Sequence, residues 1–121
     1  MSREYDGYND EAVVAPATLK QIITGANFDA EGAIFWLRYI VVRNSSAAVD
    51  GVFEVYDQVE GAAAAASKRF EFDVPANATT VFEVPSPGIS FKIDITAGIT
   101  GNLGTVAIGT VHAGGYLVGG M

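Results

Sequence analysis

The residue best suited to acid–base chemistry in this chain is His112, the only histidine among its 121 residues. Hydrolytic catalysis needs such a base beside an activated nucleophile. The sequence has no cysteine and no G-x-S-x-G motif, and His112 stands at a strand end that runs into Gly114 and Gly115. We therefore expect an ordinary strand-end histidine and neither an acid–base residue nor a metal ligand, so the chain is predicted not to be an enzyme.

Carboxylates are the second possible source of chemistry, since a glycosidase needs two of them at a fixed separation. Most candidates fall on the polar positions of β-prone runs and predict a solvated acidic face instead: Glu54, Glu71, Asp73, Glu83 and Asp94. The glycines at 98, 101 and 104 lie between two β-prone runs, whereas a phosphate-binding loop opens a helix. With no D-x-D-x-D-G loop either, we expect no catalytic, cofactor-binding or metal site and no cofactor.

The charge of the chain bears on its partners. Seven basic and fourteen acidic residues give a net charge of −7, and only Lys68 and Arg69 are adjacent bases. Nucleic acid and anionic membrane surfaces are therefore disfavoured as partners. The longest apolar stretch, 33–42, contains Arg38 and is about half the roughly 20 residues of a spanning helix. The acidic N-terminus does not resemble a signal peptide, so we expect synthesis in the cytoplasm.

The elements that must position these residues are short β-prone runs separated by turn residues. The runs cover residues 18–24, 34–42, 52–58, 70–74, 79–84, 89–96 and 105–112, with a possible last strand at 116–118. This spacing predicts an all-β, single-domain antiparallel β-sandwich over 18–121, or else a small barrel. Residues 1–17 have no usable period and predict an extended N-terminal arm, which either frays or docks on a partner. The alanine run at 61–66 is expected to be a loop with at most one helical turn.

Two of the runs differ in their surfaces. Residues 89–96 alternate without exception, which predicts a strand whose wet face carries Ser90, Lys92, Asp94 and Thr96. Residues 34–42 are apolar on both faces, with Ile34, Trp36, Arg38, Ile40 and Val42 on one of them. Exposing that stripe would be costly, so the N-terminal arm, a loop or another subunit should cover it. Trp and Arg favour a protein interface, which is predicted at Tyr5, Tyr8, Val13, Val14, Ile34, Trp36, Arg38 and Ile40.

The chain also resembles the small structural proteins of tailed-bacteriophage virions, in particular capsid decoration (cement) proteins. The likeness lies in residues 85–91, which lead into a strand, in the Ala97-Gly98 turn and in the closing run 104–111. It implies a jelly-roll-like sandwich that forms a homo-oligomer (trimer or dimer) on the outer capsid surface of the virion. There it would bind the major capsid protein and stabilise the shell. The alternative is a ligand-recognition module that binds carbohydrate or a receptor through Trp36, Tyr39, Tyr56 and Tyr116.

Overall fold

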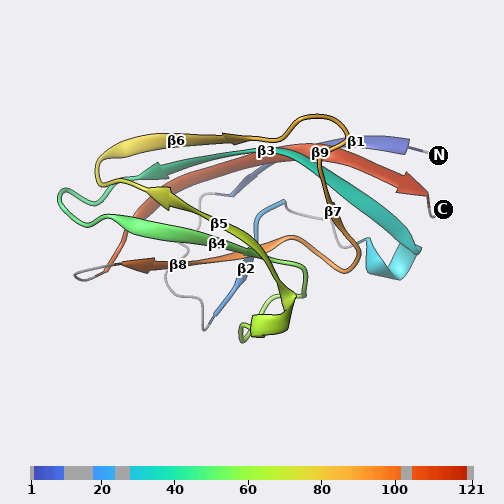
Figure 1. Ribbon diagram of the computed structural model, residues 1–121, viewed down its shortest axis with the longest axis horizontal. Helices are drawn as coiled ribbons and strands as arrows, with labels where there is room; N and C mark the ends of the chain where they lie inside the picture. The colour runs from blue at the N-terminus through green and yellow to red at the C-terminus, as the bar shows by residue number, and fades with distance from the viewer. Residues whose placement is uncertain (1, 10–17, 24–27, 102–104, 120–121) are drawn as a thin grey trace.

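Two antiparallel sheets pack face to face in the computed structural model, which describes residues 2–9, 18–23, 28–101 and 105–119 (Figure 1). The predicted all-β sandwich is confirmed. The strands are β1 (Ser2–Asn9), β2 (Lys20–Gln21), β3 (Ala33–Asn44), β4 (Gly51–Tyr56), β5 (Lys68–Val74), β6 (Ala78–Glu83), β7 (Ile89–Phe91), β8 (Thr96–Gly101) and β9 (Ile108–Gly119). Two single 3₁₀ turns complete the described elements, η1 (Asp29–Glu31) and η2 (Ala65–Ser67).

The strands pair in a nested order. The larger sheet runs β1-β9-β3-β6, with the short β7 also paired to β3, and the smaller sheet runs β2-β8-β4-β5. The hairpin β4–β5 lies in the middle of the chain, and the pairs β3–β6, β2–β8 and β1–β9 follow outward from it. With β7 included, the larger sheet has five strands and the smaller sheet has four, and the jelly-roll-like arrangement stays a prediction.

The core lies between the sheets, and β3 and β4 contribute several of its largest side chains. Phe35, Leu37 and Val42 of β3 are fully buried, as are Phe53 and Val55 of β4. Each such side chain stabilises the fold by about 1.5–3 kcal/mol relative to exposure. The two sheets therefore form one rigid support for whatever their outer faces carry.

A β-bulge in β3 changes which side chains face the core. Leu37 lies opposite Gly115 of β9 and Tyr39 lies opposite Gly114, so Arg38 is an extra residue in the ladder. The two strands approach closely there, because a Cβ on Gly115 would lie 2.1 Å from the backbone oxygen of Trp36. A bulge of this kind shifts the inward–outward alternation by one residue.

The bulge corrects the predicted face of Ile40. The prediction placed Ile40 beside Trp36 on an outward stripe, whereas the structure buries Ile40 completely with Phe35 and Leu37. Uninterrupted alternation holds only up to Arg38, and beyond it Tyr39 and Val41 take the outward positions. Ile40 is therefore a core residue and not part of an interface.

The N-terminal segment contributes a strand to the larger sheet. Residues 2–9 form β1, which pairs antiparallel with β9 from Ser2 opposite Val118 to Asn9 opposite Val111. The segment is extended, but these residues lie in the plane of the sheet. The remainder of the predicted arm, 10–17, lies outside the described residues, and the domain boundary at residue 17 stays a prediction.

The predicted strand at 89–96 is in fact two strands in different sheets. β7 ends at Phe91 in the larger sheet, and β8 begins at Thr96 in the smaller one. Residues 92–95 cross between them, so the alternation continues in the sequence but not in space. As a result Asp94 and Thr96 are buried, which contradicts their predicted places on a wet face, and Ile93 is 38% exposed.

Candidate functional site

The outer face of the larger sheet carries a group of apolar side chains that we call the Trp36 face. It comprises Ile34 and Trp36 of β3, Tyr116 and Val118 of β9, and Pro87 of the loop between β6 and β7. In Figure 1, β3 and β9 run side by side along the upper sheet, on the side away from β4 and β5. The Trp36 face therefore points away from the core.

Backbone register places these side chains together. Trp36 lies directly opposite Tyr116, and Ile34 lies directly opposite Val118. Phe35 on β3 is fully buried in the core, so its neighbours along the strand point outward. Tyr116 and Val118 are 40% and 43% exposed, well above what a packed apolar side chain retains. The result is a contiguous apolar surface across two adjacent strands.

A shallow hollow of about 430 Å³ lies on the Trp36 face. Trp36, Tyr116 and Val118 form its floor on the sheet, and Ser86 and Pro87 line it from the loop. The loop is anchored at the β3 bulge, where Nε of Arg38 donates a hydrogen bond to the backbone oxygen of Val84 at 3.1 Å. The hollow is therefore held by backbone and packing contacts and offers aromatic surface beside a hydroxyl group.

The same outer surface continues toward β6. Tyr39 packs edge-to-face on His112, with ring centroids 5.6 Å apart. Val41 lies between His112 of β9 and Val81 of β6, and Val81 is 56% exposed. His112 thus lies in an aromatic contact on the sheet surface. The prediction of a strand end there is wrong, because β9 continues through Gly114 and Gly115 to Gly119.

Of the predicted interface residues, the structure brings Ile34 and Trp36 together on this face. Arg38 lies at the bulge beside the loop, and Ile40 is in the core. Tyr5 and Tyr8 are described by their backbone register alone, opposite Gly115 and His112. Val13 and Val14 lie outside the described residues.

Sequence reasoning missed Val118 and Pro87 as members of this surface and named Tyr116 only as a possible sugar-stacking residue. The signal was present in the run that ends the chain, where Tyr116 and Val118 alternate with the buried Leu117. The proposed four-aromatic platform does not exist as a unit, since Tyr56 lies on the smaller sheet and is only 5% exposed.

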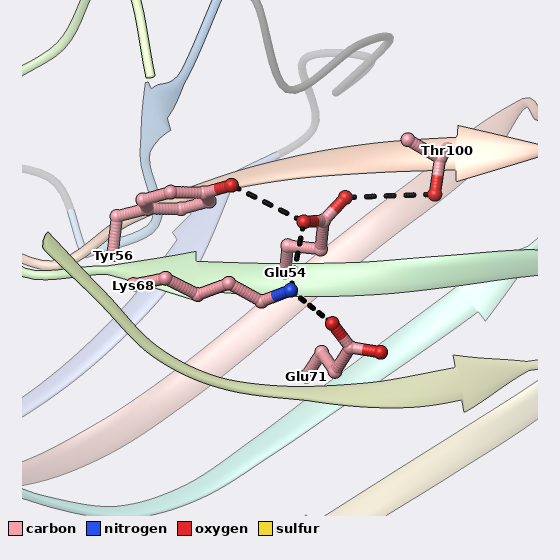
Figure 2. A network of polar contacts seen from close by, with 5 residues as sticks. All are labelled: Glu54, Tyr56, Lys68, Glu71 and Thr100. Atoms are coloured by element: carbon pink, nitrogen blue, oxygen red, sulfur yellow. Dashed lines mark hydrogen bonds and ion pairs between the residues drawn. The ribbon is translucent and has the colours of Figure 1, made fainter. Parts of the chain in front are cut away.

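A polar cluster lies on the outer face of the smaller sheet (Figure 2). Glu54 and Glu71 are directly opposite each other on β4 and β5. The Lys68 ammonium lies 3.1 Å from Oε1 of Glu54 and also binds Glu71. The Tyr56 hydroxyl donates to the same Glu54 oxygen at 3.1 Å, and the Thr100 hydroxyl donates to Oε2 at 3.5 Å.

In this cluster two carboxylates share one ammonium group, which offsets part of their charge. Hydrogen bonds to Glu71 and Glu54 raise the pKa of Lys68 above its ordinary value. Burial, followed by the Glu54 charge, raises the pKa of Tyr56. Two like charges opposite each other would destabilise the hairpin, and Lys68 offsets that repulsion. Because its ammonium binds both carboxylates, the cluster is suited to joining β4, β5 and β8 and not to acid–base exchange.

A second polar cluster holds the segment that crosses between the two sheets, residues 92–95. The Asp57 carboxylate accepts hydrogen bonds from the backbone N–H groups of Lys92, Ile93 and Asp94, the shortest at 2.8 Å from Ile93. Asp94 accepts from the Gln21 side chain at 2.9 Å and from the N–H of Ile95. Asp94 is 3% exposed, and this burial raises the pKa of its carboxyl group.

Neither cluster assembles a metal site. Among residues 2–9, 18–23, 28–101 and 105–119, no group of three or more His, Cys, Asp or Glu side chains is placed to hold a metal ion. In the described part of the chain, no helix has the length and apolar character needed to cross a bilayer.

Comparisons with protein-family models, with curated proteins and with solved structures find no match to this chain.

Proposed function

We propose that this chain is a structural virion protein that binds the outer surface of an assembled phage capsid and stabilises the shell. The observation that carries the proposal is the Trp36 face. Exposed apolar residues are common singly, but a contiguous apolar surface around a Trp–Tyr pair is typical of a protein-binding site. The capsid as the particular partner follows from the sequence resemblance described above.

The geometry of the Trp36 face supports binding to a preformed surface. The backbones of Trp36 and Tyr116 are held by strand pairing on a packed two-sheet support, so the backbone needs little ordering on binding. Large aromatic side chains at the centre of an interface contribute much of its affinity. Trp36 is therefore the residue that we assign as the anchor.

The proposed mechanism is mass action. A protein that binds only the assembled shell stabilises it by RT ln(1 + [L]/Kd) for each site. The major capsid protein is the proposed partner, and the protein is proposed to act on the virion surface as a homo-oligomer, dimer or trimer. Binding of several linked copies to one shell would raise the apparent affinity without any new contact.

We propose a binding role and not catalysis. The carboxylates of Glu54 and Glu71, on directly opposite residues, both bind Lys68, and the buried Asp94 is bound by Gln21 and by the N–H of Ile95. These pairings account for the clustered charges through the fold itself.

Ligand recognition is a second candidate, and the hollow beside Trp36 favours it. Tyr116 and Trp36 offer adjacent aromatic surface, and Ser86 supplies a hydroxyl group at its rim. Glu4 of β1 is exposed and lies opposite Tyr116, which adds a carboxylate to the same row. A pyranose ring could stack on the aromatic pair and bond to these polar groups. Selective binding on a glycan array would favour this candidate over capsid binding.

The capsid proposal is tested by adding the purified protein to shells assembled from the major capsid protein of the phage that encodes it. We expect the protein to sediment with the shells and to raise their disassembly temperature. Unassembled capsid subunits serve as the control and should not bind. Absence of binding to assembled shells would refute the proposal.

A further inference from the structure

β6 is an edge strand of the larger sheet, at the opposite edge from β1, and no described strand pairs with its outer side. β6 consists of Ala78-Thr-Thr-Val-Phe-Glu83, and its register with β3 runs without a bulge. Natural edge strands are usually blocked by lysine, proline, bulges or short length. β6 has none of these, while β5 begins with Lys68 and Arg69 and contains a register shift, and β2 is two residues long.

Hydrogen-bond phase shows which backbone groups of β6 are free. The N–H of Val84 donates to the backbone oxygen of Arg38 at 2.9 Å, and the oxygen of Val84 accepts from the Arg38 side chain at 3.1 Å, so both backbone groups of Val84 are directed toward β3. In an antiparallel ladder, residues of this kind alternate with residues whose N–H and C=O groups point away from the partner strand. The alternation leaves Thr79, Val81 and Glu83 with both groups directed to the free edge. No group in the described part of the chain is hydrogen-bonded to them there.

The side chains of β6 alternate along the strand with the same period as its backbone groups. Thr79, Val81 and Glu83 are exposed on the outer face, whereas Ala78, Thr80 and Phe82 are half-buried. Phe82 stacks against the rings of both Phe70 and Phe72, with centroids 4.7 and 4.9 Å away, so the strand is fixed from within. The edge is therefore a rigid template for another strand.

We propose that a second copy of this chain occupies the β6 edge, with the two β6 strands antiparallel about a twofold axis at Val81. In this register Val81 pairs with Val81, and Thr79 pairs with Glu83 of the other copy. Every outward N–H and C=O of the three residues is then bonded on both strands. Shifting the register by one residue on each strand places inward side chains opposite outward ones or leaves groups unbonded.

Side-chain complementarity supports the second copy as the occupant. The two Val81 side chains, each 56% exposed in the single chain, would cover each other at the axis. Glu83 would face Thr79 of the other copy, and Thr79 lies beside Arg43 on the neighbouring β3 strand. Strands are about 4.8 Å apart, so the Glu83 carboxylate comes within reach of the other copy's Arg43. Opposite charges thus meet on both sides of the axis.

This inference deepens the proposed function by separating two surfaces. The β6 edge joins copies of the chain, and the Trp36 face remains available to the shell. The dimer depends on the β6 edge and not on the Trp36 face, so it can fail without affecting capsid binding, and capsid binding can fail without affecting the dimer.

Sedimentation velocity from about 1 to 300 μM tests the dimer. We expect a concentration-dependent dimer, with Val81→Lys weakening it at least about tenfold because two ammonium groups would meet at the axis. Val59→Lys is the matched control, since Val59 is 52% exposed in a loop, and it should dimerise like the natural chain. Val81→Pro is the second variant. It removes an N–H that the single chain leaves free, and proline is tolerated where a strand N–H faces solvent.

Hydrogen exchange gives a direct readout of the register. The amides of Thr79, Val81 and Glu83 should become more protected as the protein concentration rises, and those of Thr80 and Phe82 should not change. A monomer throughout the concentration range would overturn the proposal. So would a dimer unchanged by both Val81 variants, or one dissociated by Trp36→Lys, which would move self-association to the Trp36 face.

Discussion

The carboxylate of Asp57, just after β4, accepts a hydrogen bond from the backbone N–H of Ile93 at 2.8 Å. The same carboxylate binds the N–H groups on either side, at Lys92 and Asp94. One side chain thus fixes the segment that carries the chain from β7 in the larger sheet to β8 in the smaller sheet. This contact therefore joins the smaller sheet to the larger sheet, which carries both the Trp36 face and the β6 edge.

Asp57→Ala should therefore destabilise the fold by about 1–3 kcal/mol, because it leaves backbone donors of the crossover without their acceptor. Chemical denaturation measures the change. Asp73→Ala removes an exposed carboxylate of β5 and should change the free energy of unfolding by no more than about 0.5 kcal/mol. Equal effects of the two substitutions would show that Asp57 does not hold the crossover.

Asp94→Asn tests the cost of burying a carboxylate in this crossover. Burial raises the native pKa of Asp94 above its ordinary value of 3.8, so the folded chain binds a proton more tightly than the unfolded chain. The stability from this group is thus present at low pH and is lost as the pH rises from about 3.8 through the raised native pKa. Asparagine retains an oxygen for the N–H of Ile95 and carries no charge.

The free energy of unfolding of the variant minus that of the natural chain should therefore increase from pH 3.5 to pH 7, because the natural chain loses stability over this range. Paired denaturation curves at several pH values measure this difference. A difference that is constant with pH, or that runs the other way, would contradict a raised pKa at Asp94.

Phe91→Ala and Ile93→Ala distinguish the observed crossover from the strand predicted by alternation. Phe91 is fully buried and its truncation should cost about 3–5 kcal/mol. Ile93 is 38% exposed in the crossover, so its truncation should cost about 1 kcal/mol or less. Urea denaturation compares them, and similar losses would mean that both side chains share one buried strand face.

Lys68→Met should destabilise the β4–β5 hairpin by about 1 kcal/mol, because it leaves Glu54 and Glu71 facing each other without a cation. The raised native pKa of Lys68 means that its contribution is complete below 10.5 and is lost as the pH rises through the native value. The stability difference between variant and natural chain should therefore shrink at strongly alkaline pH. Lys92→Met, at an exposed lysine, is the control and should be nearly silent at every pH.

Much of the fold could be predicted because most strands bury one face in the core and expose the other. The alternation of β4 and the turn residues between strands were sufficient to predict an all-β sandwich. The segment 89–96 shows where this reasoning stops: alternation records which side chains are apolar, but not whether neighbouring residues belong to one sheet. The crossover depends on Asp57, which is thirty-six positions from Ile93 in the sequence.

The candidate site was predicted in part for a related reason. Trp36 and Ile34 were correctly assigned to one surface because they precede the bulge. The assignment of Ile40 to the same surface was wrong, because the bulge at Arg38 reverses the direction of the side chains after it. The bulge depends on the close approach of Gly115 on β9, a contact that local sequence does not reveal. Pro87 joins the surface only through the folding of a loop over β3.

The central claim is that the Trp36 face binds the assembled shell, and the affinity of Trp36→Lys for shells tests it most directly. We expect the circular dichroism of this variant to stay close to that of the natural chain, because Trp36 points outward from β3, and the unfolding midpoint to fall only modestly, because its ring is half-buried. Its affinity for assembled shells, measured by co-sedimentation, should fall at least about tenfold, as for an aromatic anchor. Val59→Lys should bind as the natural chain does. A folded Trp36→Lys protein that binds shells with unchanged affinity would contradict the account.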